Sequence, residues 1–139
     1  MKKALGTIAV ALLALAGCGG DTCSSQDARV TPQNQGCTLA ANAPVTINVR
    51  LCPQCTDSSP SCQAELRPGN IIEVSPVVQQ CQANQGCDIT QQCQISPVAC
   101  PVNASLQAGT YTASYLNASG SIASSQVDVA PGGSASCTL

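Results

Sequence analysis

Hydrophobic and polar residues alternate in several short stretches of this chain, a pattern typical of strands with one buried face. The clearest stretch is 45–51, in which every second residue is Val, Ile or Leu. Residues 62–67 and 71–78 alternate in the same way, and the turn-forming sequence Pro68-Gly69-Asn70 separates them. The pattern predicts a strand at 45–51 and a hairpin over 62–78, with Pro76 at a sheet edge or a bulge.

A second alternating pair predicts another hairpin, over residues 110–129. Tyr111 and Tyr115 lie on the apolar face of its first half, and the turn-forming sequence Asn117-Ala118-Ser119-Gly120 follows. The two tyrosines share one face, so they form either a stacking platform for sugars or part of the core. The chain has no other aromatic residue, which favours the core.

The fold class predicted from these patterns is all-β, as a small disulfide-rich β-sandwich. No segment after residue 18 shows a sustained helical period. The stretch Leu106-Gln107-Ala108-Gly109-Thr110-Tyr111-Thr112 is similar to the start of a late strand in bacterial immunoglobulin-like and transthyretin-like sandwich domains. This resemblance implies a sandwich of one of those two kinds.

The longest apolar run, at 4–16, follows the two lysines Lys2 and Lys3. A helix that crosses a bilayer needs about 20 apolar residues, so this run is too short to span. Its length and its basic flank are those of a signal peptide. It ends in Leu15-Ala16-Gly17-Cys18, which resembles the lipobox of bacterial lipoproteins.

The lipobox resemblance covers residues 1–18. It implies that residues 1–17 are removed, that Cys18 carries the lipid, and that this lipid holds the chain on a membrane of the bacterial cell envelope. Gly19 stands where an Asp would retain such a protein in the inner membrane, which favours the outer membrane, on its periplasmic face or at the cell surface.

The cysteine count agrees with a lipid on Cys18. The 139 residues include 11 cysteines, and an odd number in an exported chain requires an explanation. Ten remain after Cys18, and an oxidising compartment would pair them as disulfides. These candidates are Cys23, Cys37, Cys52, Cys55, Cys62, Cys81, Cys87, Cys93, Cys100 and Cys137.

The domain organisation follows from the composition along the chain. Residues 18–25 are small and polar and predict a tether, and residues 26–139 predict one disulfide-stapled β domain. Gln and Cys are concentrated between 79 and 94, so residues 79–101 are expected to form a cross-linked insertion or long loop.

Composition excludes several kinds of function. The chain has no histidine, which removes catalytic triads and His-ligated metal sites. Only three basic residues remain against seven acidic ones after residue 17, so nucleic-acid binding is not expected. No cofactor motif is present, and the carboxylates show no spacing typical of a calcium site. Glu65 and Glu73 are expected to face each other across the turn, most simply as two solvated charges.

Cys52-Pro53-Gln54-Cys55 is the sharpest chemical motif. A Cys-x-x-Cys pair serves in thiol–disulfide oxidoreductases when its first thiol lies at a helix N-terminus. Here a strand precedes the motif and turn-forming residues follow, so structural disulfides are the first interpretation. A redox pair and a metal site are the alternatives.

The sequence therefore predicts a lipid-anchored envelope protein without enzymatic activity, serving a binding, adhesion or structural role. Its expected partners are the membrane, through Cys18, and an envelope protein or glycan. A periplasmic oxidoreductase that uses Cys52 and Cys55 is one alternative, and a disulfide-rich protease inhibitor is another.

Overall fold

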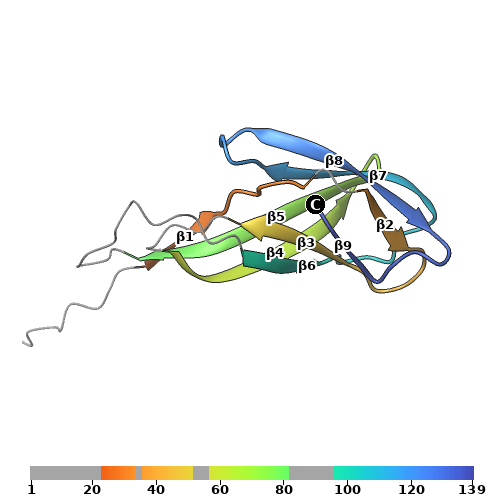
Figure 1. Ribbon diagram of the computed structural model, residues 1–139, viewed down its shortest axis with the longest axis horizontal. Coiled ribbons are helices and arrows are strands. Elements are labelled where there is room, and N and C mark those ends of the chain that lie inside the picture. The colour runs from red at the N-terminus through yellow and green to blue at the C-terminus, as the bar shows by residue number, and fades with distance from the viewer. Residues whose placement is uncertain (1–22, 34–35, 52–56, 82–95) are drawn as a thin grey trace, which may run out of the picture.

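The computed structural model describes residues 23–33, 36–51, 57–81 and 96–139, and within them the chain is all-β. These residues contain nine strands and no helix (Figure 1). The strands are β1 (Cys23–Asp27), β2 (Cys37–Ala40), β3 (Thr46–Leu51), β4 (Asp57–Arg67), β5 (Ile71–Cys81), β6 (Ser96–Pro101), β7 (Gly109–Leu116), β8 (Ile122–Ala130) and β9 (Ser136–Thr138). The predicted all-β, disulfide-containing fold is confirmed.

The strands form two sheets. The larger has the order β1-β5-β7-β8-β2, and β4 pairs with the other edge of β5. The smaller has the order β6-β3-β9. Both predicted hairpins are present, since β4 pairs antiparallel with β5 and β7 pairs antiparallel with β8. Their alternating patterns place every second side chain in the core, and this fixes the register.

Local turn chemistry sets the β4–β5 hairpin. Gly69 has φ +84° and Asn70 has φ +57°, both in the left-handed region that Gly and Asn adopt most readily. Pro68 cannot donate to a ladder and so ends β4. The turn places Glu65 opposite Glu73.

Pro76 lies in a central strand, where the sequence predicted an edge or a bulge. On one side β5 pairs with β4 from Ile71 to Gln80, with a register shift between Ser58 and Ser61 of β4. On its other side β5 pairs with β7 over 71–73 and with β1 over 77–81. Pro76 occupies the interval between these two partners, where its carbonyl accepts from the amide of Ala28. A missing N–H is tolerated there because neither β7 nor β1 continues a full ladder through this position.

Both sheets contribute to one hydrophobic core. The largest fully buried side chains come from strands of each sheet and from the connections and C-terminal residue between them: Leu39, Ile47, Leu51, Ile72, Leu106 and Leu139. None of the described polar or charged residues is buried. The chain has no Phe or Trp, so Val, Ile and Leu from both sheets fill the core together with Tyr111 and Tyr115.

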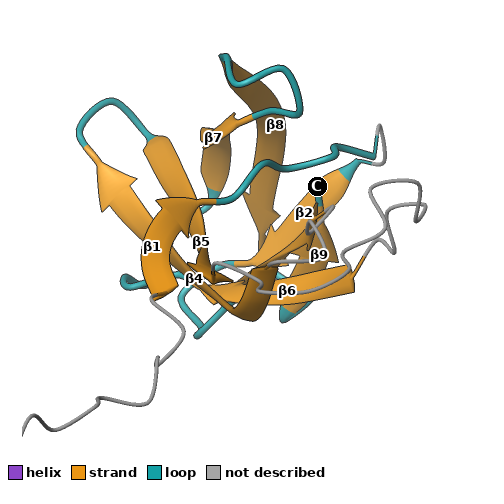
Figure 2. Ribbon diagram, turned by 90° about the vertical axis from the view of Figure 1, so that its left-hand side faces the viewer, coloured by secondary structure: helices purple, strands orange, loops and turns teal. Residues whose placement is uncertain are grey.

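The two sheets meet at both edges, and a disulfide crosses each meeting line. At one seam Ala64 of β4 bridges Val102 just after β6, and Cys62 is bonded to Cys100. At the other, Leu39 of β2 bridges Ser134 just before β9, and Cys37 is bonded to Cys137. The Cα–Cα distances are 4.7 and 5.3 Å. Seen end-on in Figure 2, the strands surround the core, with β4 beside β6 and β2 beside β9.

Two predicted boundaries change. Cys23–Asp27 forms β1, so residues 23–25 belong to the folded domain and the expected tether is shorter. Residues 79–81 end β5 and residues 96–101 form β6, so the expected insertion at 79–101 begins and ends in core strands. The sequence pattern did not predict β6, because Pro97 and Pro101 flank its two buried residues, Val98 and Cys100.

Candidate functional site

Four connections between strands lie at one end of the molecule, which we call the four-loop end. They are 41–45, 68–70, 102–108 and 131–135. Strand directions require this grouping: β7 runs parallel to β5, whereas β8 and β2 run against them. The starts of β5 and β7 and the ends of β2, β4 and β8 therefore meet at this end, while β1 begins at the other.

Backbone hydrogen bonds tie these connections to one another and to the sheets. The amide of Asn42 donates to Leu106 O at 2.8 Å, which joins connection 41–45 to connection 102–108. The amide of Thr112 donates to Asn70 O at 2.9 Å, which joins the β4–β5 turn to β7. The four-loop end is thus a surface of loops that backbone hydrogen bonds hold on a rigid scaffold, and such loops commonly carry binding residues.

Tyr111 of β7 holds connection 102–108 in place through hydrogen bonds of its hydroxyl. Its hydroxyl donates to Gln107 O at 3.1 Å and accepts from Gln107 N at 3.2 Å. The ring is 6 % exposed, and Leu106 beside it is fully buried. A tyrosine that bonds the backbone four residues upstream resembles the tyrosine corner of Greek-key sandwiches. This contact fixes the path by which the chain passes from one sheet to the other.

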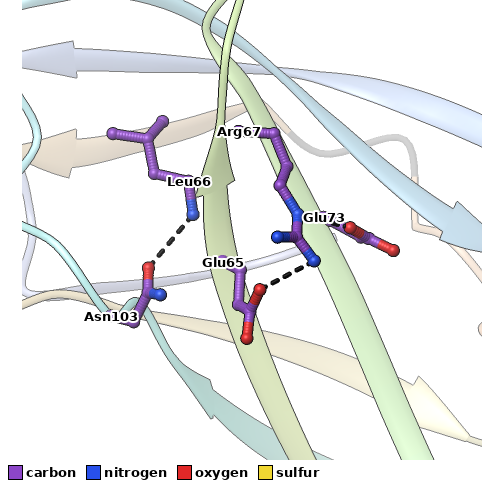
Figure 3. A network of polar contacts seen from close by, with 5 residues as sticks. All are labelled: Glu65, Leu66, Arg67, Glu73 and Asn103. Atoms are coloured by element: carbon purple, nitrogen blue, oxygen red, sulfur yellow. Dashed lines mark hydrogen bonds and ion pairs between the residues drawn. The ribbon is translucent and has the colours of Figure 1, made fainter.

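Arg67 lies between two carboxylates beside the β4–β5 turn. It forms ion pairs of 2.7 Å with Glu65 and with Glu73, which are partners in the ladder (Figure 3). The hydrogen bond to Glu73, followed by the charge of Glu65, raises the pKa of Arg67 above its usual value. Both glutamates are exposed to solvent, as the simpler of the two sequence interpretations expected.

Asn103 joins connection 102–108 to β4 by two hydrogen bonds. Its Oδ1 accepts from the amide of Leu66 at 3.1 Å (Figure 3). Its own amide donates to Ala64 O at 2.9 Å. The sequence did not predict this contact with β4. The position of Asn103 after a short strand gave no periodic signal by which the contact could have been found.

Acidic groups predominate at the four-loop end. Asp128, near the end of β8, accepts from the hydroxyl of Thr110 at 3.1 Å and from Gln126 Nε2 at 3.0 Å. With Glu65 and Glu73, it makes three carboxylates beside the single guanidinium of Arg67 among the described residues of these strand ends. The surface offers hydrogen-bonding groups and negative charge to a partner.

Five of the cysteines are disulfide-bonded in the structure. Four of them form the two seam disulfides, and the fifth is Cys23, at the start of β1. Cys81 ends β5. The other candidates lie outside the described residues, so their roles stay predictions: Cys18, Cys52, Cys55, Cys87 and Cys93.

The tyrosines do not form a sugar-stacking platform. Tyr115 is 4 % exposed, and its hydroxyl lies 2.7 Å from Ser125 Oγ. Tyr111 is equally enclosed. The alternation places both rings inward, and the prediction that they belong to the core is confirmed.

The described residues contain neither a metal-binding cluster nor a membrane-spanning helix. No group of three or more His, Cys, Asp or Glu residues among them is placed to hold a metal ion. No helix in the described part of the chain is long and apolar enough to cross a membrane. Comparisons with protein-family models, curated proteins and solved structures find no match to this chain.

Proposed function

We propose that this chain is a lipid-anchored protein of the bacterial cell envelope, which binds an envelope protein or glycan without catalysing a reaction. Its anchor is the lipid expected on Cys18, and its folded part is the disulfide-stapled β domain. Gly19 favours the outer membrane as its location.

The seam disulfides support an envelope location. Disulfides form and persist in oxidising compartments and are rare in reducing ones. The two seam disulfides join strands far apart in sequence, with separations of 38 and 100 residues, so they are part of how this domain closes. A domain built this way suits a compartment outside the cytoplasm.

One observation carries the proposed orientation: the first strand begins at the end of the molecule opposite the four-loop end. Cys23 pairs with Cys81 at the end of β5, whereas the turn at 68–70 precedes the start of β5. Ten residue steps separate the first and last residues of β5, Ile71 and Cys81, and at about 3.3 Å a step they set these two levels about 33 Å apart. A lipid on Cys18 would hold the β1 end at the membrane and present the four-loop end to partners.

The binding role is supported by how the four-loop end is built. Connections 41–45 and 102–108 are hydrogen-bonded to each other, Tyr111 holds the second of them, and carboxylates lie beside the β4–β5 turn. A rigid, polar loop surface loses little conformational entropy when a partner binds.

Cell fractionation tests the anchor. The full chain, the Cys18→Ser variant and the matched control Gly20→Ser would be expressed in a bacterium that processes lipoproteins. We expect the full chain and the control in the membrane fraction and in the detergent phase, and Cys18→Ser in neither. A Cys18→Ser chain that stays with the membrane contradicts the proposal.

A further inference from the structure

Cys23 is disulfide-bonded, and the backbone brings one other cysteine directly opposite it. β1 and β5 are antiparallel, and their register pairs Cys23 with Cys81 at the outer limit of the ladder. In an antiparallel sheet, directly opposite residues lie on the same face. The register thus supplies a specific candidate for the partner of Cys23.

The phase of the ladder favours a disulfide at this pair. Ala28 continues the same register opposite Pro76, and its amide donates to Pro76 O at 2.8 Å, so these two form a hydrogen-bonded pair. The pair types alternate along antiparallel strands. Five residues earlier, Cys23 and Cys81 form a non-hydrogen-bonded pair. Such pairs have Cα atoms about 4.5 Å apart, within the range that a disulfide spans.

The neighbouring pair of the same type shows that side chains meet across these strands. Ser25 lies opposite Gln79, and Gln79 Nε2 donates to Ser25 Oγ at 3.0 Å. This pair is two positions along the ladder, on the same face as Cys23. The two strands are therefore close enough on this face for a covalent link.

We propose that Cys23 and Cys81 form a disulfide that clamps the first strand of the domain to β5. With both seam disulfides assigned, six cysteines remain after Cys18, and six can pair in 15 ways. The clamp leaves Cys52, Cys55, Cys87 and Cys93, which can pair in only 3 ways.

The bond forms by thiol–disulfide exchange. The two thiols lose two protons and two electrons as the sulfur–sulfur bond forms, and a protein disulfide of the envelope takes up the electrons and becomes a dithiol. The clamp thus needs only the oxidising compartment that the proposed function implies.

The clamp fixes the distance between the domain and its anchor. Five residue steps separate Cys18 from Cys23, and they reach about 18 Å at most. All of β1 is exposed, and within the larger sheet it pairs with β5 alone, so an unclamped β1 could peel away. The next attachment is Ala28, which is buried and whose amide donates to Pro76 O. From there the reach to Cys18 is about 35 Å.

Disulfide mapping of the purified full-length protein tests the clamp. The chain is alkylated without reduction, digested with pepsin at low pH to prevent exchange, and searched for linked peptides. We expect a linked pair that contains Cys23 and Cys81 and disappears on reduction. Cys23 linked to any other cysteine, or free while the seam disulfides are intact, overturns the clamp and leaves the lipid anchor untouched. A clamped chain without lipid on Cys18 contradicts the anchor alone.

Hydrogen exchange tests what the clamp does. In Cys23→Ser/Cys81→Ser, the β1 amides should exchange at least tenfold faster than in the unaltered chain. The matched control is Ser25→Ala, which loses the adjacent side-chain hydrogen bond but keeps both cysteines, and it should change these rates less than threefold. Equal exchange in the double variant and the unaltered chain contradicts the clamp.

Discussion

At Gly133 the backbone of the β8–β9 connection lies so close to β2 that no side chain fits between them. A Cβ on Gly133 would overlap the carbonyl group of Leu39. This carbonyl belongs to the backbone of β2, so it cannot move aside as a flexible side chain would. Gly133→Ala should therefore open the seam, with a cost of about 1–3 kcal/mol. Urea unfolding would measure it. Gly36→Ala is the control, since nothing lies within 4 Å of a Cβ there. Equal midpoints for the two variants would show that the seam is not tightly packed.

Tyr111→Phe tests the brace under connection 102–108. The variant keeps the buried ring but leaves the amide and carbonyl of Gln107 without their hydroxyl partner. We expect a loss of about 1–2 kcal/mol in the free energy of unfolding. Tyr115→Phe, which gives up one contact with Ser125, should lose less. The reverse order, measured by denaturant unfolding of both variants, would mean that the corner does not stabilise the domain.

At the residue scale, the sequence predicted inward and outward positions better than it predicted contacts. The burial of Tyr111 and Tyr115 followed from alternation and from the lack of other aromatic residues. The roles of Gly133 and Asn103 did not, because each depends on a strand distant in sequence that local patterns do not bring into view.

Among the elements, the β4–β5 hairpin depends on Arg67 to separate two like charges. Glu65 and Glu73 are directly opposite in the ladder, and like charges in that position repel. Arg67→Gln should lower the urea midpoint at low salt, and the loss should shrink as NaCl screens the repulsion. In Arg29→Gln the lost partner is the Ala118 carbonyl, so its midpoint should respond less to salt. A salt-independent loss in Arg67→Gln would contradict the electrostatic account.

The seam disulfides are expected to matter individually. Replacing Cys62 and Cys100 with Ser, or Cys37 and Cys137 with Ala, should cost about 2–5 kcal/mol for each pair. Each change frees one edge where the sheets meet. Thermal unfolding of both double variants would measure the effect. An unchanged midpoint in either one would mean that hydrogen bonds and packing alone close that seam.

At the element scale, the strands with long alternating patterns were predictable, and the short ones were not. β3, β5, β7 and β8 each carry several alternating residues, and their predicted ranges are close to those observed. β1, β2 and β9 have three to five residues each, too few for a clear period, and β6 is interrupted by Pro97 and Pro101. Pro76 suggested an edge because a proline usually excludes a central strand. A change of partner along one side of β5 could not be read from local sequence.

In the whole molecule, we expect the β1 end to face the membrane and the four-loop end to bind the partner. If the four-loop end binds the partner, Ser105→Arg should weaken binding to isolated envelope fractions at least tenfold, because it adds a bulky cation to an exposed loop position. Ser124→Arg places the same residue on the exposed face of β8 and should leave binding unchanged. Equal binding by both variants, measured by sedimentation with the fractions, would place the partner elsewhere.

The mass of the mature N-terminal peptide shows whether Cys18 is the first residue and whether it carries a lipid. The full chain would be purified from bacterial membranes, digested and analysed by mass spectrometry. The account predicts a first peptide that begins at Cys18 and carries the mass of a diacylglyceryl group. A peptide that begins elsewhere, or one with an unmodified Cys18 thiol or a Cys18 disulfide, would contradict it.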